Sequence, residues 1–280
     1  MDTGTFTLLV FGGSVAAGLL GSLTGLGGGA VIIPLLVLVL GVDLRYAIGA
    51  SLVAVIATSS GAAAAFIREG YTNIRLGMLL EVATTVGAIA GAWIAKDTPL
   101  GVIAAVFGGV LLWTAYSTLR PPVSHPDPVG DGSKTLGARL RLDSTYPTPK
   151  GMETYKVHAV PAGFGVMFLA GVLSALVGVG SGVVKVYAMD RLMRIPFKVS
   201  TTTSNFMIGV TAAASAGIYL HRGQIEPGLA MPVALGALLG SFVGARLLAR
   251  MRVRTLRIIF ALLVAVAGLQ MIYRGATGAL

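Results

Sequence analysis

Residues 21–34 read GSLTGLGGGAVIIP, and this stretch decides the fold because a glycine cluster interrupts an otherwise apolar segment. A looser copy, SALVGVGSGVVKVY, covers residues 174–187. Three or four glycines within five positions disfavour a continuous helix, since each glycine costs about 1 kcal/mol relative to alanine. The two stretches therefore predict a broken helix at the same place in each of two halves.

The composition around these stretches is that of a membrane protein. Apolar residues make up 55% of the chain and charged residues only 11%, too few to cover a soluble domain of 280 residues. Apolar runs of about 20 residues match the ~30 Å hydrocarbon core of a bilayer when helical. We therefore predict an all-α integral membrane protein, with these runs at residues 46–67, 76–95, 98–119, 200–220, 229–249 and 255–273.

Three further features of the composition narrow the class. The N-terminal MDTGTFTLLVF lacks the basic segment of a cleavable signal peptide, so we expect it to begin the first membrane helix. The chain has no cysteine, which removes disulfides and thiol chemistry. The net charge of +10 lies in basic residues between apolar runs, which favours membrane orientation over nucleic-acid binding.

The chain contains an internal duplication at an offset of 153 residues. Without a gap, residues 18–95 align with 171–248 and share sixteen identities, several of them glycines. We therefore expect a first transmembrane repeat over residues 1–119, a linker over 120–161 and a second repeat over 162–280.

The linker has a different character from the repeats. Its first part, RPPVSHPDPVGDGSK, is rich in proline and glycine and is typical of an exposed segment. Loosely alternating ARLRLD and ETYKVHAV flank a turn-rich STYPTPKG, which predicts a small extramembrane β-hairpin.

The basic residues choose between two topologies. If each glycine-interrupted segment (about 6–41 and 163–193) crosses once, the halves are parallel and the flanking charges divide equally. If each folds back as a hairpin followed by three spans, the repeats are inverted and sixteen Lys/Arg face four, leaving Lys185 aside. The positive-inside rule favours the inverted repeats, with a cytoplasmic linker and both termini outside. The smaller group consists of Arg45, Lys96, Arg222 and Arg274.

Inverted repeats with matching broken helices are a recurring plan of secondary transporters. Glycine allows positive φ and brings bare amides close to a ligand. Free N–H groups at the start of the following half-helix favour an anion. The alternative is that the glycines only allow close packing, which is our interpretation of Gly87, Gly91, Gly240 and Gly244, spaced four apart on helices.

Polar residues follow the second glycine cluster. Lys185 costs at least ~3 kcal/mol in lipid, so we expect it to face a cavity and attract an anion, unless it snorkels or pairs with Asp190. The next span opens with KVSTTTSNFM, whose donors could complete an oxyanion site, although helix capping explains one or two of them. The predicted substrate-binding residues are Gly27, Gly28, Gly29, Ser51, Gly180, Ser181, Gly182, Lys185, Thr203, Ser204 and Asn205.

Glu81 is the carboxylate most clearly within an apolar run, six residues after Arg75. Buried acids in membrane helices often carry protons, so Glu81 is our candidate for proton coupling. A structural ion pair with a basic residue near the cytoplasmic face is the alternative.

These motifs resemble a known family. GLGGGAVIIP followed by IGASL, and GVGSGVVKVYAMDRLMRIPFKVSTTTSNFMIGVTAAASAGIY in the second half, resemble the TauE/SafE-type sulfite exporters over nearly the whole chain except the linker. The resemblance implies a carrier in the cytoplasmic membrane that moves sulfite, sulfonates or related organosulfur anions, often as an exporter.

The sequence leaves alternatives to this function. A carrier for another small anion, such as a carboxylate, has the same features. A serine protease built on Ser181 would need a base, and only Lys185 is within reach. A cation channel would need more acidic residues at depth than Glu81. The sequence indicates no ATP-binding P-loop, cofactor, metal site or enzymatic activity, and it leaves a homodimer open.

Overall fold

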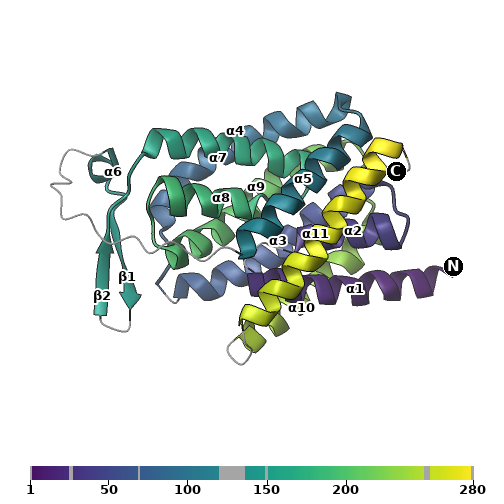
Figure 1. Ribbon diagram of the computed structural model, residues 1–280, viewed down its shortest axis with the longest axis horizontal. Coiled ribbons are helices and arrows are strands. Elements are labelled where there is room, and N and C mark those ends of the chain that lie inside the picture. Colours follow the sequence, from purple (N-terminus) through teal and green to yellow (C-terminus); the bar gives the residue numbers. More distant parts are fainter. Residues whose placement is uncertain are drawn as a thin grey trace.

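The computed structural model describes residues 2–24, 28–68, 70–119, 136–148, 151–248 and 253–278. Most of these residues are helical (Figure 1). The first series of helices comprises α1 (Thr3–Thr24), α2 (Gly29–Pro34) with its π-helical continuation η1 (Leu35–Val39), α3 (Leu44–Arg68), α4 (Ile74–Asp97) and α5 (Leu100–Leu119). The second comprises α7 (Val160–Val177), α8 (Gly182–Tyr187) with η3 (Ala188–Leu192), α9 (Phe197–His221), α10 (Pro227–Leu248) and α11 (Val253–Thr277).

Seven helices in the described part of the chain are long and apolar enough to cross a membrane: α1, α3, α4, α5, α7, α10 and α11. Helix α9 is as long but carries the hydroxyl and amide side chains of its first turns. The breaks at the glycines leave α2 and α8 with six residues each, too short to span a bilayer even with η1 and η3. The chain is therefore an all-α, multi-pass membrane protein, as its composition predicts.

Glycines set the distance between the long helices. A Cβ at Gly87 on α4 would overlap the carbonyl oxygen of Phe168 on α7, and one at Gly240 on α10 would overlap that of Val15 on α1. Gly91 lies in the same way against Val172. These helices thus pack backbone to backbone, which confirms the packing interpretation for Gly87, Gly91 and Gly240.

The contacts of α4 with α7 and of α10 with α1 are related by the 153-residue offset of the duplication. Val15 and Phe168 differ by 153 positions, as Gly87 and Gly240 do. A second pair of contacts repeats the match, because Gly18 lies against the carbonyl of Ala237 and its counterpart Gly171 lies against that of Thr84. Helix α1 therefore packs on α10 as α7 packs on α4, while α3 packs on α9 and α5 on α11.

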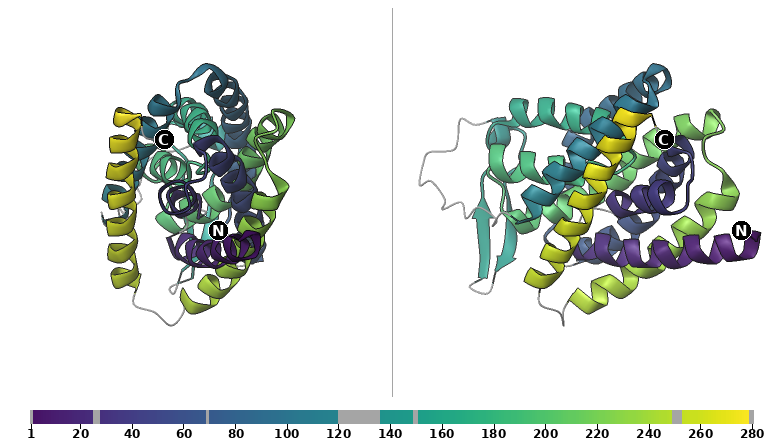
Figure 2. Two further views of the ribbon diagram at one scale, coloured as in Figure 1. Left: turned by 90° about the vertical axis from the view of Figure 1, so that its right-hand side faces the viewer. Right: turned by 45° about the vertical axis from the view of Figure 1, so that its right-hand side comes forward.

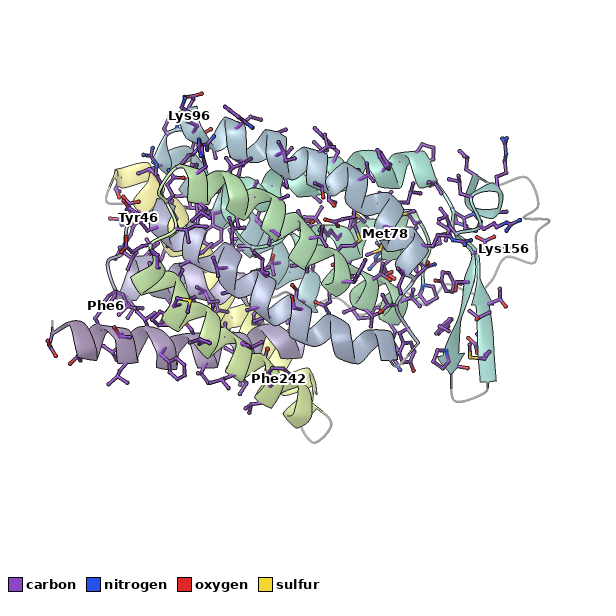
Figure 3. All side chains as sticks on the ribbon, turned by 180° about the vertical axis from the view of Figure 1, so that it is seen from behind. Phe6, Tyr46, Met78, Lys96, Lys156 and Phe242 are labelled. Carbon is purple, nitrogen blue, oxygen red and sulfur yellow. The ribbon has the colours of Figure 1, made fainter. Side chains whose placement is uncertain are left out.

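The described part of the linker forms α6 (Leu136–Arg139) and an antiparallel hairpin of β1 (Ser144–Thr148) and β2 (Gly151–Tyr155). The strands lie nearer the turn than the sequence pattern predicts, since STYPT itself forms β1 and residues 138–143 form the end of α6 and a turn. The hairpin projects from one end of the helical body, and both termini lie at the opposite end (Figures 1 and 2). Lys156 marks the hairpin end and Lys96 the other end (Figure 3).

Candidate functional site

The two glycine loops touch one another inside the helical body. A Cβ on Gly29, the first residue of α2, would lie 3.1 Å from the Cα of Val179 in the second loop and 2.8 Å from Ser51 Oγ. Ser51 on α3 donates a hydrogen bond of 2.8 Å to the carbonyl of Gly178. Ser51 of the first half therefore fixes the second loop, and Gly29 has no room for a side chain.

Positive φ angles explain why glycine is needed at the loops. Gly28 caps α2 with φ 72°, and Gly178 and Gly180 have φ 71° and 79°. Ser181 adopts the same left-handed region with φ 46°, where a non-glycine residue is uncommon. Gly25 and Gly27 lie outside the described residues.

Unpartnered hydroxyls flank the second loop. Ser181 Oγ is buried and has no hydrogen-bond partner in the described part of the chain. The same holds for Ser174 Oγ, one helical turn before Gly178 on α7. Buried polar groups are almost always paired, so two free donors beside one loop indicate a place for a ligand or water.

Lys185 is completely buried, one turn after Ser181 on α8. Its Nζ donates a hydrogen bond to Thr211 Oγ1 on α9 and lies 3.8 Å from Glu81 Oε2 on α4. The side chain therefore does not snorkel to the surface. Among described residues it pairs with Glu81, whereas Asp190 Oδ2 lies 3.6 Å from Arg191 Nε.

Glu81 is brought to Lys185 by the packing of α4 against α7 and α9. Its Oε1 accepts hydrogen bonds from Thr211 Oγ1 at 2.6 Å and from Thr85 Oγ1 at 3.2 Å. Its Oε2 is buried without a hydrogen bond to a described residue. The first half thus supplies the carboxylate of Glu81 and the second half the ammonium group of Lys185, and the Thr211 hydroxyl is hydrogen-bonded to both.

The hydroxyl-rich start of α9 is divided between two places. Ser204 Oγ donates to the carbonyl of Gly182 at 3.3 Å, which places it beside the second loop. Asn205, the next residue on α9, is buried at 4% exposure. Thr203 Oγ1 instead accepts from the backbone N–H of Asn73 at the start of α4, at 3.1 Å, so the structure does not bring its hydroxyl to the loops.

Thr211 and Thr84 belong to this cluster, and reasoning from the sequence missed both. Thr84 Oγ1 lies 3.4 Å from Thr211 Oγ1. The signal was available: Thr211 stands seven residues, or two helical turns, after Ser204 and so shares its face of α9. A helical pattern, however, does not show which acid faces that side of the helix.

The described part of the chain has seven apolar helices long enough to span a membrane, and its two broken helices meet beside a buried ion pair. This combination is typical of multi-pass membrane transporters with discontinuous helices. The chain belongs to the TauE/SafE sulfite exporter family, since residues 10–271 match the family described as "Sulfite exporter TauE/SafE". It is therefore a membrane transporter.

Two curated relatives agree with this class. The chain is 28% identical over 278 residues to "Probable membrane transporter protein YunE" of Bacillus subtilis (strain 168), covering 97% of this chain and 98% of the relative. It is 26% identical over 250 residues to "Probable membrane transporter protein YdhB" of the same organism, covering 89% and 93%. No solved structure matches the chain.

Proposed function

We propose that this chain is a secondary carrier that exports sulfite or a related small organosulfur anion by alternating access. The observation that carries the proposal is Lys185, a fully buried cation one turn beyond a loop whose flanking serine hydroxyls have no partner among the described residues. A buried charge in a membrane protein is costly and marks a substrate or ion pathway. The family description supplies the substrate class.

The same proposal makes the two halves inverted repeats, each a glycine-interrupted helical hairpin followed by three helices. Its support is the equivalence of the packing contacts at the 153-residue offset, together with the position of both termini at the end opposite the linker hairpin. In such a plan the two halves exchange roles when the carrier opens to the other side. The broken helices then hold the substrate near the midplane.

The anion site is proposed at the meeting of the two loops. Lys185 supplies the charge, and hydroxyl, amide and backbone N–H groups supply hydrogen bonds. Ser181 lies in the second loop and Ser204 bonds the carbonyl of Gly182 beside it, and Asn205 follows Ser204 on α9. Thr203 is instead engaged at the start of α4. Glu81 is proposed as the proton-coupling group. The remaining members of the site are Gly27, Gly28, Gly29, Ser51, Gly180 and Gly182.

The orientation follows from the basic residues. The larger group of Lys/Arg includes those of the linker, and the smaller group consists of Arg45, Lys96, Arg222 and Arg274. By the positive-inside rule, the linker with its hairpin is therefore proposed to lie in the cytoplasm of a cell whose inner membrane holds the protein. Met152, on β2, is 66% exposed. Because the chain has no cysteine, Met152→Cys provides a single label. It should react with impermeant maleimide only after the cells are opened. Labelling in intact spheroplasts would contradict this orientation and place the hairpin outside.

Transport of ³⁵S-sulfite into proteoliposomes tests the substrate. We expect uptake above that of protein-free vesicles and competition by unlabelled sulfite and by methanesulfonate, but not by acetate. Competition by acetate at equal concentration, without competition by the sulfonate, would favour the carboxylate carrier. If the wild-type protein moves sulfite neither into nor out of the vesicles, the proposed substrate is wrong.

A further inference from the structure

We propose that Thr211 is the positioning residue that links the proton on Glu81 to the charge on Lys185, so that one proton and one monovalent anion load together and transport is electroneutral. This inference rests on the proposed function and specifies its coupling. It follows from one hydroxyl group with several partners and from the charge balance of the site.

The Thr211 hydroxyl has one hydrogen and more acceptors than it can serve. Lys185 Nζ donates to Thr211 Oγ1, so the hydroxyl must direct its own proton elsewhere. Three acceptors are within reach: Glu81 Oε1 at 2.6 Å, the backbone carbonyl of Met207 at 3.0 Å and, more distant, Thr84 Oγ1 at 3.4 Å. When Glu81 is ionised, the charge-assisted bond to the carboxylate is favoured.

Protonation of Glu81 reverses this arrangement. The carboxylic acid now donates to Thr211 Oγ1, and the hydroxyl turns its hydrogen to the carbonyl of Met207. Lys185 no longer faces a carboxylate and can direct its charge to an anion. The proton comes from water on the loading side, resides on a Glu81 oxygen and leaves to water on the releasing side, so the cycle is balanced.

Charge balance requires the two events to occur together. The empty site is neutral, because Lys185 is 0% exposed and is compensated by a Glu81 carboxylate whose residue is 7% exposed. An anion alone would leave a net negative charge in this buried place, and a proton alone would leave a net positive one. Either is expensive in a low-dielectric interior. Binding both restores neutrality, and by linkage each must raise the affinity for the other.

No other charge in the described residues around this pair competes for the role. The helices packed against α4 here are α7 and α9. Helix α7 has no titratable side chain, and the titratable groups of α9 are Lys198 in its first turn and Tyr219 and His221 near its end.

The remaining titratable groups belong to α4 itself and to α8 with η3. On α4, Arg75 lies near one end, and Lys96 and Asp97 lie at the other. On α8 and η3, Lys185 faces Glu81, the half-exposed Tyr187 packs its ring against Trp113, and Asp190 lies beside Arg191. Glu81 and Lys185 therefore balance each other's charge.

The wild-type protein provides the first measurement. In proteoliposomes with a potassium gradient, at a fixed, mildly acidic pH where sulfite is mostly the monovalent hydrogensulfite ion, initial ³⁵S-sulfite uptake should be unchanged when valinomycin imposes a membrane potential. Glu81→Gln, which cannot take up the proton, should respond to the potential. Potential-dependent uptake by the wild type, with one negative charge moved per sulfite, would overturn the inference while leaving sulfite transport established. Absence of sulfite transport would instead overturn the proposed function.

Variants at Thr211 provide the second measurement. Thr211→Val removes the hydroxyl at nearly constant volume, so Lys185 and Glu81 pair directly and the anion must displace a carboxylate. Sulfite affinity should fall about tenfold or more, and the pH of half-maximal uptake should shift downward by about one unit. Thr211→Ser keeps the hydroxyl and should restore both values.

The second half has a matched control in the first. Thr58 aligns with Thr211 at the 153-residue offset and bonds the carbonyl of Val55 on its own helix. Thr58→Val should leave the pH profile unchanged. If Thr211→Ser shifts the pH profile of uptake while Thr58→Val does not, the hydroxyl is not the positioning group. This comparison does not depend on Thr211→Val and holds even if that variant fails to fold.

Discussion

The two glycine loops occupy corresponding places in the two halves, yet they have different chemistry. Where the second half has Lys185, the first has Ile32 at the aligned position. Ala234 aligns with Glu81, while Thr58 aligns with Thr211. The ion pair therefore exists once, although the scaffold that could hold it is present twice.

This difference separates two kinds of constraint. The backbone plan is kept by contacts that tolerate no side chain, such as Gly87 on Phe168 and Gly240 on Val15. The polar groups are not needed for that plan, because Ile32 is as completely buried as Lys185. Duplication thus accounts for the repeated packing contacts, and divergence of the two halves accounts for an ion pair at only one of the two aligned positions.

The largest effect is expected from closing the second loop. Gly180 has φ 79°, and a Cβ there would lie 2.7 Å from Ile208 Cγ2, so Gly180→Val adds both strain and overlap. Sulfite uptake should be abolished while the protein stays monodisperse on size-exclusion chromatography. Gly165→Val on α7 is the control, since nothing lies within 4 Å of a Cβ at Gly165. Full activity of Gly180→Val would remove the loop from the transport path.

The next effect concerns the ion pair. Lys185→Met should weaken sulfite binding roughly 10- to 100-fold, the value of one lost charge-assisted hydrogen bond. It should also destabilise the protein by about 3–5 kcal/mol, because Glu81 is left buried without its cation. Thermal unfolding in detergent should show most of that loss recovered in the Lys185→Met/Glu81→Gln double variant.

The first half again supplies the control for this prediction. Ile32→Met, at the aligned position, should cost less than about 1.5 kcal/mol and leave binding unchanged. Equal losses of sulfite binding in Ile32→Met and Lys185→Met would mean that the two half-sites are equivalent.

A smaller effect should distinguish the two aligned serines, Ser51 and Ser204. Ser51 bonds the carbonyl of Gly178 in the other half at 2.8 Å, whereas Ser204 bonds Gly182 within its own half at 3.3 Å. Ser51→Ala should therefore lower the free energy of unfolding by about 1 kcal/mol, and Ser204→Ala by less. Denaturation in parallel would measure the difference, and a larger effect of Ser204→Ala would contradict the proposed role of Ser51 in joining the two halves.

The last effect is local and concerns the hairpin, which only one end of the molecule carries. Burial raises the pKa of the Tyr155 phenol, which accepts a hydrogen bond from Asn73 Nδ2 at 2.8 Å. A raised folded-state pKa means that, below the unfolded pKa of about 10, the neutral phenol stabilises the docking of the hairpin against the start of α4. That stabilisation is lost as the pH rises through the higher folded value.

A fluorophore on Met152→Cys should therefore report undocking of the hairpin at strongly alkaline pH. Tyr155→Phe should weaken docking by about 1 kcal/mol and abolish that alkaline transition. An alkaline transition of unchanged size in Tyr155→Phe would assign it to another group.

The helices and their breaks could be predicted from the amino-acid pattern. Apolar runs near 20 residues predict α3, α4, α5, α9, α10 and α11 to within a few residues, because the bilayer fixes their length and every backbone bond is made within the segment. The glycine clusters predict where α1 and α7 end, because several adjacent glycines cannot continue a helix against their entropic cost. The duplication followed from identities alone.

The meeting of the polar residues, in contrast, became visible only in three dimensions. Lys185 and Glu81 are far apart in the chain, and the pair forms because glycines let α4 approach α7 and turn its acid toward α8 and α9. Asp190 stands closer to Lys185 in sequence but lies beside Arg191, and Thr203 is one residue from Ser204 yet bonds the start of α4. Local pattern fixes the face of a helix on which a side chain lies. Which residue occupies the opposite face depends on how close two backbones can come, and that distance is a property of the whole packing.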